Sequence, residues 1–527
     1  MIPERTSVLI AGAGPVGLAL ALELGLRDID CIIVEKRDGK LHVPKMSAVS
    51  TRNMELCRRW GIAEDVRHAV WPKGSRLDFI YVENLSGREL ARYKNPVYGE
   101  RDPKAITAET SCHCPQIFFD PILAARVRKQ ESVRFAYQTE LAGFAQDGDG
   151  VKAELVDANN GAKRIVRADY LVGCDGASGL VREALDLKLE GLGVVANSIN
   201  IFFRSSELAN LHDKGWARIY RLIDEDGCWS ELIPIDGKEL WRLSIFDDQR
   251  SLDHPRDFIE RIFGGPFPFE IINVSAWERR DFVAADYRRG RVLIAGDAAH
   301  QCSPTGGLGM ATGIEDAVNL GWKLAAMLQG WGGSRLLDSY AFERRPVAKR
   351  NVDLSTRSYL AVESIPAWKH GADIASYKGE LDSWRDNLGR YTVPDHVKMQ
   401  YTYEDSPISC PDGTPRDDPE PPVFVHSARP GSRAPHAWLD DGRSIYDLFD
   451  EGFTLLRIGE NAPDGRALVE AGKRAGLPLK SAAVYEAVVL ERYKQPLVLV
   501  RPDGHVAWRG ASGPVDPDAV INRLRGV

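Results

Sequence analysis

The chain has 527 residues, enough for about three domains, and its net charge of −7 argues against a nucleic-acid-binding protein. It is 44% hydrophobic and 27% charged, as in ordinary globular proteins, and without an apolar run of about 18 residues we expect no membrane partner. Its 8 scattered cysteines and immediate first strand predict a cytoplasmic protein without signal peptide, disulfides or bound metal.

The first 35 residues have the pattern strand, glycine turn, helix, strand, acid. An apolar strand over residues 8–11 leads into Gly-x-Gly-x-x-Gly at Gly12, Gly14 and Gly17, and a helix follows. Gly12 permits the turn, Gly14 lets a pyrophosphate approach the backbone, and Gly17 lets the helix pack on the strand. The second strand ends at Glu35, where an acid binds a ribose hydroxyl. The pattern predicts a dinucleotide site at the helix N-terminus.

The next 150 residues continue this domain. We expect helices over 53–60 and 118–130, strand-like pieces over 75–105, and short strands with turns over 133–172. A buried strand ends in Gly173-Cys174-Asp175-Gly176. By spacing alone, a turn followed by a capped helix explains Asp175 as well as a ligand contact does.

A change of pattern follows at residues 185–285, where strand-like segments dominate and predict a β-rich insertion. The parallel-strand pattern returns at 291–297, ends in Gly296-Asp297, and precedes a glycine-rich turn and a long helix over 313–328. Asp297 could bind a ribityl or ribose hydroxyl, and the N–H groups of Gly309 and Met310 could face an anionic group. Residues 335–400 look helical, 405–435 form a Pro- and Asp-rich linker, and 438–527 form a small α/β domain.

These three motifs, in this order, resemble those of the class A flavoprotein aromatic hydroxylases, single-component monooxygenases of the para-hydroxybenzoate and phenol hydroxylase type. The resemblance covers about residues 5 to 350. Segments 403–408, 431–436 and 499–509 resemble the linker and last hairpin of the thioredoxin-like domain that ends the phenol hydroxylase branch. No cysteine follows Cys410, so dithiol chemistry is excluded there. The chain differs from many relatives at Lys45, Ala311 and Ser303.

The resemblance implies an α/β fold: a Rossmann-like FAD-binding domain of the para-hydroxybenzoate hydroxylase type, an inserted β-rich substrate domain, and a C-terminal thioredoxin-like domain. The expected bounds are 1–74, 106–184 and 286–360 for the FAD-binding domain, 75–105 and 185–285 for the substrate domain, 361–430 for a helical segment and linker, and 431–527 for the last domain. The implied flavin contacts are Gly12, Gly14, Pro15, Val16, Gly17, Glu35, Lys36, Lys45, Arg52, Gln116, Asp175, Gly296, Asp297, Pro304, Gly307, Gly309 and Met310.

The resemblance also implies a reaction. NADPH or NADH reduces the FAD, O₂ adds at its C4a carbon, and the hydroperoxide hydroxylates a phenolic substrate held by a homodimeric enzyme. A cation or base near the phenol would assist. The candidates are Arg218, Tyr220 and Arg242 on the insertion, each of which could equally be an ordinary strand residue, with His300 and Pro304 beside the glycine turn.

Two alternatives remain open. A flavin-dependent halogenase would carry Trp-x-Trp-x-Ile-Pro, and the stretch at 229–234 has Glu231 in place of the second Trp, which disfavours it. The other is a non-catalytic FAD-binding scaffold, which would need no β-rich insertion. Four aromatic residues of the insertion suit an aromatic guest, although as strand residues they could be core: Trp216, Tyr220, Trp229 and Trp241. Ala311 and Leu308 predict a roomy, apolar pocket for a bulky or weakly charged phenol.

Overall fold

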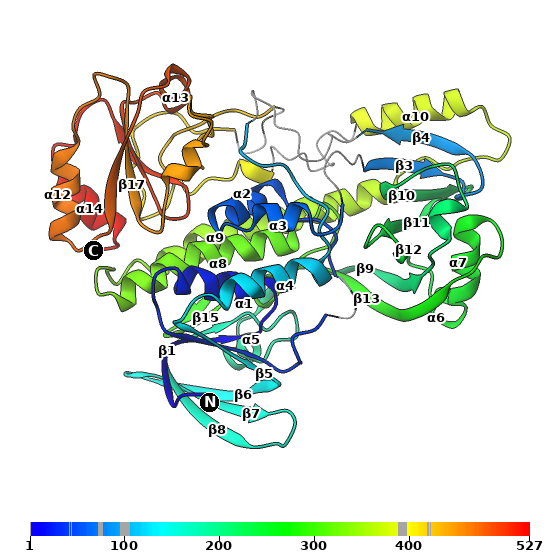
Figure 1. Ribbon diagram of the computed structural model, residues 1–527, viewed down its shortest axis with the longest axis horizontal. Helices are drawn as coiled ribbons and strands as arrows, with labels where there is room; N and C mark the ends of the chain where they lie inside the picture. The colour runs from blue at the N-terminus through cyan, green and yellow to red at the C-terminus, as the bar shows by residue number, and fades with distance from the viewer. Residues whose placement is uncertain are drawn as a thin grey trace.

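The computed structural model describes residues 2–41, 43, 45–71, 77–94, 106–387, 398–418, 421 and 423–527. It contains two eight-stranded sheets and one four-stranded sheet. The C-terminal domain and the second sheet lie at opposite ends of the molecule, with the first sheet and two long helices between them (Figure 1). The expected α/β fold with a β-rich insertion and a small last domain is confirmed.

The first sheet is the predicted nucleotide-binding sheet. Strands β15, β8, β1, β2 and β5 run parallel in that order, and strand β1 pairs Val8 with Cys31 on one side and Tyr170 on the other. Its apolar runs are buried, as is typical of parallel strands covered on both faces. The bounds are β1 Arg5–Ala11, β2 Cys31–Glu35, β5 Val133–Tyr137, β6 Thr139–Asp147, β7 Gly150–Asp157, β8 Lys163–Gly173, β14 Arg288–Arg289 and β15 Val292–Ile294.

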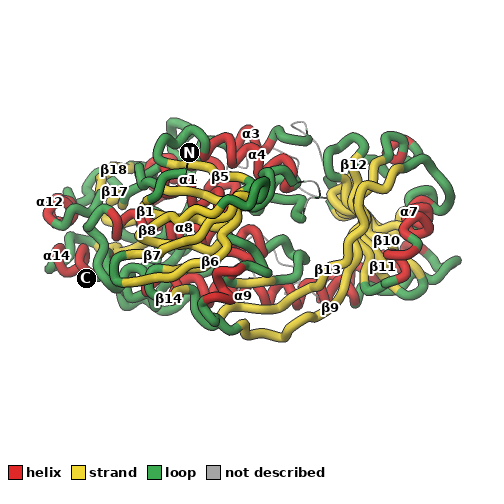
Figure 2. The backbone as a smooth tube through the Cα atoms, turned by 90° about the horizontal axis from the view of Figure 1, so that it is seen from below, coloured by secondary structure: helices red, strands yellow, loops and turns green. Residues whose placement is uncertain are grey.

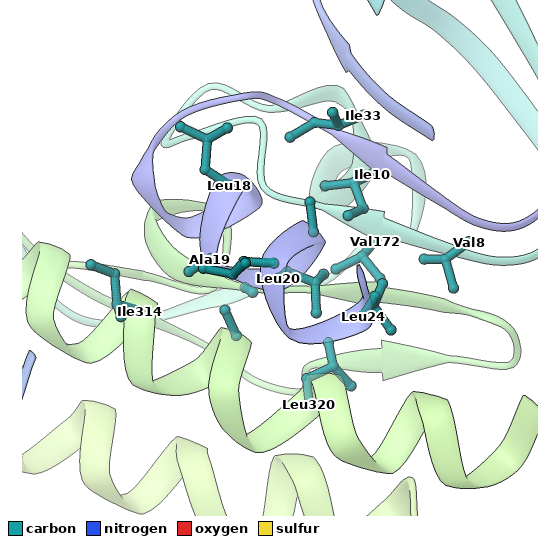
Figure 3. Close-up of a cluster of buried hydrophobic side chains, with 14 of the residues drawn as sticks. Val8, Ile10, Leu18, Ala19, Leu20, Leu24, Ile33, Val172, Ile314 and Leu320 are labelled. Carbon is teal, nitrogen blue, oxygen red and sulfur yellow. The ribbon is translucent and has the colours of Figure 1, made fainter. Parts of the chain in front are cut away.

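Helix α1 connects this sheet to the long helix α8. Its apolar residues are buried all round, because one side packs on the strands and the other on α8. Figure 3 shows α1 in this position, with Leu20, Val172 of β8 and Leu320 of α8 in one buried cluster. The helices around this core are α1 Pro15–Gly25, α2 Thr51–Arg59, α3 Ala63–Arg67, α4 Gln116–Val127, α5 Leu180–Ala184, α8 Gly309–Leu328 and α9 Asp338–Glu363.

The second sheet has the order β16-β13-β9-β12-β11-β10-β3-β4. Its long strands β9 and β13 run from the first domain into the β-rich one (Figure 2). Helix α7 covers the outer face with Phe258, Ile259 and Ile262. Of the strands expected over 75–105, two are present, and residues 75–76 and 95–105 lie outside the described part. The bounds are β3 Asp78–Val82, β4 Glu89–Tyr93, β9 Leu189–Arg204, β10 Ala217–Asp224, β11 Gly227–Pro234, β12 Leu240–Phe246, β13 Glu270–Ala284, β16 His300–Gln301, α6 Arg250–Asp253 and α7 Pro255–Phe263.

Strand β16 joins the two domains. It lies in the segment that the sequence assigned to the nucleotide-binding domain, yet it pairs with β13, His300 opposite Val283 and Gln301 opposite Phe282. The turn that contains Asp297 is therefore attached directly to the second sheet.

The C-terminal domain has the sheet order β18-β17-β19-β20, in which β17 and β18 are parallel and the other neighbours antiparallel. Helix α10 Ile374–Asn387 and the linker precede it. Its bounds are β17 Phe453–Ile458, α12 Arg466–Arg474, β18 Leu479–Val484, α13 Ala487–Tyr493, β19 Leu497–Val500, β20 Val506–Gly510 and α14 Pro517–Leu524. Across the described residues, no helix combines the length and apolar character needed to cross a membrane.

Candidate active site

The three glycines of the turn have two different roles: two are required by the fold, and one leaves space for a ligand. Gly12 has φ +103°, and a Cβ there would lie 2.3 Å from the carbonyl oxygen of Cys174. A Cβ at Gly17 would lie 1.9 Å from the carbonyl oxygen of Gly12. At Gly14, by contrast, an added Cβ would meet no described atom within 4 Å. Gly12 and Gly17 are therefore required by the fold, whereas Gly14 borders open space where a phosphate could approach.

The carboxylate of Glu35 lies against this turn. It accepts hydrogen bonds from the backbone N–H groups of Ala13 at 3.1 Å and of Arg37 at 3.0 Å. Pro15 begins helix α1, which has no side-chain cap at its N-terminus, so the first N–H groups remain for a ligand. Val16 brings two motifs together, because a Cβ on Gly296 would lie 2.8 Å from its Cγ2.

Asp175 lies at the end of β8, beside the glycine turn. Its Oδ2 accepts a hydrogen bond at 3.0 Å from the N–H of Val181, in the first turn of α5, whose N-cap residue is Gly179. Its Oδ1 is buried and has no hydrogen-bond partner among the described residues. Burial raises the pKa of this carboxyl, and the hydrogen bond from Val181 and the nearby cations Arg182 and Lys36 offset part of that rise. The unpaired Oδ1 leaves Asp175 one acceptor for a ligand, in addition to the hydrogen bond that Oδ2 accepts from Val181.

The Gly296–Asp297 turn is held from behind by α8. Asp316 of α8 accepts hydrogen bonds from the N–H of Gly296 at 3.2 Å and from Nε2 of His300 at 2.7 Å. His300 and Asp316 are both buried, whereas Asp297 is exposed at the turn. His300 thus holds the turn through the carboxylate of Asp316.

The following loop leads into helix α8. Pro304 and Gly307 are exposed, and the N–H of Gly307 donates to the carbonyl oxygen of Pro304 at 3.0 Å. The helix starts at Gly309 without a side-chain cap, and Met310 is half-buried in its first turn. A helix start without a side-chain cap leaves backbone N–H groups that an anionic group could bind, and the contacts of Gly309 and Met310 with such a group remain predictions.

Two further residues predicted to contact the flavin, Gln116 and Arg52, have different partners in the structure. Gln116 begins α4 and donates to Asp120 at 3.0 Å, and burial raises the pKa of Asp120 to about 7. Lys45 is exposed, and its charge acts on Asp120. Arg52 is engaged elsewhere: its guanidinium binds Glu55 at 3.0 Å and the carbonyl oxygen of Asp503 at 2.8 Å. We therefore no longer assign it to the flavin, because its Nη1 binds Glu55 and its Nη2 binds the C-terminal domain.

One face of the second sheet looks toward the nucleotide-binding domain. Phe202, Arg242 and Ile233 are direct cross-strand neighbours on β9, β12 and β11 and thus share a face. Phe202 and Ile233 pack with Ile117 and Phe118 of α4. We call this the inner face. Its next row is polar and comprises Asn200, Ser244, Glu231 and Arg221.

The inner face carries paired polar groups and an excess of cations. Ser244 donates to Asn200 at 2.8 Å, and Arg221 binds Glu231 at 3.0 Å. Arg242 is buried, and burial lowers the pKa of its guanidinium while Glu231 partly offsets that effect. Arg218 is half-buried beside Phe79. The predicted candidates Arg218 and Arg242 therefore both belong to this side of the sheet.

The candidate Tyr220 is wrong as a site residue. It is fully buried in the core under α7, on the outer face, and its hydroxyl donates to the carbonyl oxygen of Gly215. Trp241 belongs to the same core, and Trp216 and Trp229 are partly buried against it. Trp216 also contacts Trp71 edge-on, with 5.3 Å between ring centres. Tyr220 and Trp241 fill the interior between sheet and helix, which is the alternative that the sequence left open.

Arg279 of β13 links the inner face to the loop before α8. Its Nε donates to Ser198 at 2.9 Å, and its Nη1 donates to Ser303 and Thr305, each at 3.0 Å. Its guanidinium also lies 4.3 Å from the ring centre of Tyr359. A buried cation with these partners fixes the loop relative to the sheet.

Residues 5–355 match the FAD binding domain family, and residues 427–526 match the C-terminal domain of aromatic-ring hydroxylases. The chain belongs to the FAD-dependent aromatic-ring hydroxylases. It is 32% identical to the tetracenomycin B2 monooxygenase-dioxygenase of Streptomyces olivaceus, over 98% of this chain and 97% of that one. The rebeccamycin biosynthetic enzyme RebC with reduced flavin superposes with a TM-score of 0.90 and 35% identity, covering 100% of both chains. A ternary complex of aklavinone-11 hydroxylase with FAD and aklavinone superposes with a TM-score of 0.82 and 27% sequence identity, covering 99% of both chains.

The residues of this chain fit an FAD. The open space at Gly14, the uncapped starts of α1 and α8, the exposed Asp297 and the orphan oxygen of Asp175 are the donors, acceptors and clearance that a dinucleotide needs. The described residues contain no group of three or more His, Cys, Asp or Glu side chains arranged to hold a metal ion.

Sequence reasoning did not find Asp316, Arg279 or the polar row of the inner face. A signal for Asp316 was present: Glu315, Asp316, Asn319 and Lys323 form a polar stripe at helical spacing on an otherwise apolar helix. No comparable local signal marks Arg279 or Asn200, because their partners come from other strands.

Proposed function

We propose that the protein uses FAD, NADPH or NADH, and O₂ to hydroxylate a phenolic ring held between the inner face and the loop of residues 303–310. The observation that carries this proposal is the inner face itself. Polar and cationic side chains alternate with apolar ones on strands β9, β11 and β12, and this face packs against α4 of the FAD-binding domain. When bound, FAD supplies the redox and oxygen chemistry.

The protein's own residues would hold and polarise the ring. Phe202 and Ile233 offer apolar contact, and Asn200 and Ser244 offer hydrogen bonds that fix the orientation. A phenol reacts best as phenolate, and Arg242 is the buried cation on this face that would stabilise its oxygen. Arg279 would keep the loop at a fixed distance from the sheet and help to exclude water.

We propose a bulky or weakly charged phenol as substrate, in preference to a small benzoate. Two relatives support this, since one is named for tetracenomycin B2 and another was solved with aklavinone. Leu308 and Ala311 beside the loop are buried and apolar, which suits an apolar ring better than a carboxylate.

A panel of phenols tests the proposal. The purified protein should show a flavin spectrum, and substrate-stimulated oxidation of NADPH or NADH should yield hydroxylated product with little H₂O₂ release for bulky phenols. Tight coupling only with small benzoates would contradict the pocket argument. A halogenated product formed with halide present would favour the halogenase alternative, and no product from any phenol would favour the scaffold.

Three finer assignments complete the proposal: a homodimer, a cytoplasmic location, and a thioredoxin-like last domain within the domain bounds given above. The chain order β17-α12-β18-α13-β19-β20-α14 and the sheet order support the thioredoxin-like assignment. Size-exclusion chromatography with light scattering would test the dimer.

A further inference from the structure

The C-terminal domain is joined to the long helices by a buried network of charges. At its centre is Glu343 of α9, which accepts hydrogen bonds from Arg501 at 2.6 and 2.8 Å, from Lys323 at 2.7 Å and from Ser406 at 2.6 Å. All four residues are buried. Buried charges are costly to separate from their partners, so this contact is an integral part of the fold and not a loose docking surface.

A second chain of contacts leads from this junction to the Gly296–Asp297 turn. Tyr403 of the linker packs its ring against His505 of the C-terminal domain, with 4.3 Å between ring centres and a tilted geometry. The hydroxyl of Tyr403 accepts a hydrogen bond from Nη1 of Arg344 at 2.7 Å. Arg344 in turn donates through Nε to Oδ1 of Asp316 at 2.7 Å. The other oxygen of Asp316 holds His300 and the N–H of Gly296.

We propose that the C-terminal domain positions the flavin-binding turn through Tyr403, Arg344 and Asp316, which act as positioning residues. The proposal rests on the proposed function in one respect, that this turn contacts FAD. The links from Tyr403 to the turn are hydrogen bonds between buried groups, each with a charged partner, so none can be replaced by solvent without rearrangement. Arg344 also donates through Nη2 to the carbonyl oxygen of Thr312 at 3.0 Å, which fixes the first turns of α8.

Substitution of a single hydroxyl tests this inference. Tyr403→Phe keeps the ring packed against His505 but leaves Nη1 of buried Arg344 without its acceptor. Tyr493→Phe is a matched control, because Tyr493 is equally buried in the C-terminal domain and its hydroxyl donates to the carbonyl oxygen of Pro435 at 2.7 Å, away from Arg344. FAD affinity is measured on the full-length apoprotein by quenching of flavin fluorescence, with no turnover required.

We expect Tyr403→Phe to weaken FAD binding about five- to tenfold, the lower part of the usual range for coupling between sites. Tyr493→Phe should leave the FAD dissociation constant within twofold of wild type. In a double-mutant cycle, Tyr403→Phe and Asp316→Asn should be non-additive for FAD affinity, since both break one chain. Equal FAD affinities for the two tyrosine variants, or additive effects in the cycle, would overturn the inference.

A second pair of variants keeps the test decisive if Tyr403→Phe does not fold. Arg344→Lys keeps the charge but loses the planar donor set, and Arg345→Lys is its neighbour, bound instead to Glu190 and to the carbonyl oxygen of Ala284. Weakened FAD binding in the first alone supports the inference, and equal affinities refute it. If wild-type apoprotein bound no FAD at all, the proposed function would fail instead.

Discussion

Alanine substitutions at Gly14 and Gly17 should have opposite effects: one should weaken FAD binding, and the other should lower the stability of the apoprotein. A Cβ at Gly17 would lie 1.9 Å from a backbone oxygen of Gly12, well inside the 3.0 Å limit that Cβ contacts respect. Because neither backbone segment is a flexible side chain, α1 must move away from β1, and such overpacking costs about 1–3 kcal/mol. Gly17→Ala should therefore lower the free energy of unfolding of the apoprotein by about that amount.

Gly14→Ala should behave differently. Its backbone, at φ −73°, suits any residue, and an added methyl group would meet no described atom within 4 Å. Apoprotein stability should stay equal or rise by about 0.4–1 kcal/mol, because alanine reduces the entropy of the unfolded chain. FAD affinity should nevertheless fall about tenfold or more, which corresponds to at least about 1.4 kcal/mol, since the methyl group occupies the space of the phosphate.

Two measurements on each variant separate these effects: urea unfolding of the apoprotein and fluorescence titration with FAD. The expected pattern is a destabilised Gly17→Ala and a stable, weakly binding Gly14→Ala. Wild-type FAD affinity in Gly14→Ala would place the phosphates elsewhere. Unchanged stability in Gly17→Ala would refute the packing argument.

Further predictions concern the sheet, the junction and acid stability. Tyr220→Phe should keep the coupling of NAD(P)H oxidation to product and lower the free energy of unfolding by about 1 kcal/mol. Arg242→Met, by contrast, should reduce the amount of product formed per NAD(P)H. A catalytic defect in Tyr220→Phe would contradict the place of Tyr220 in the core. Arg501→Met should cost about 3–5 kcal/mol in urea unfolding, because Glu343 loses two buried hydrogen bonds, and a wild-type midpoint would contradict this. Burial would raise the pKa of Glu343, but Arg501 and Lys323 lower it to about 2, below its unfolded value, so its contribution is complete above about pH 5 and is lost as the pH falls toward 2. Acid unfolding followed by tryptophan fluorescence should thus be less steep in Glu343→Gln than in wild type.

The nucleotide-binding turn could be predicted from the sequence because its determinants are local. Gly12, Gly17 and the strand before them fix the geometry within a few residues of chain. The assignment of Arg52 failed for the opposite reason, since its partner Asp503 lies 451 residues away and no local pattern indicates it. The flavin contacts themselves remain predictions.

Face assignment in the second sheet shows another limit. Tyr220 and Arg221 are neighbours on β10 and point to opposite faces, so one misplaced residue reverses the assignment. The pairing of β10 contains register shifts on both sides, between Leu222 and Ile223 toward β11 and between Ala217 and Ile219 toward β3. Counting alternate residues along the sequence cannot anticipate such shifts.

The alternation on β9, β11 and β12 has a consequence for how this enzyme could be altered. Asn200, Glu231 and Ser244 point toward the FAD-binding domain, while their immediate neighbours Ile199, Leu232 and Leu243 build the core under α7. The residues proposed to contact the substrate and the residues of the core thus alternate along the same strands. Asn200, Glu231 and Ser244 can be substituted in search of new substrates while Ile199, Leu232 and Leu243 keep the core intact. This makes the sheet a natural starting point for directed evolution of substrate range.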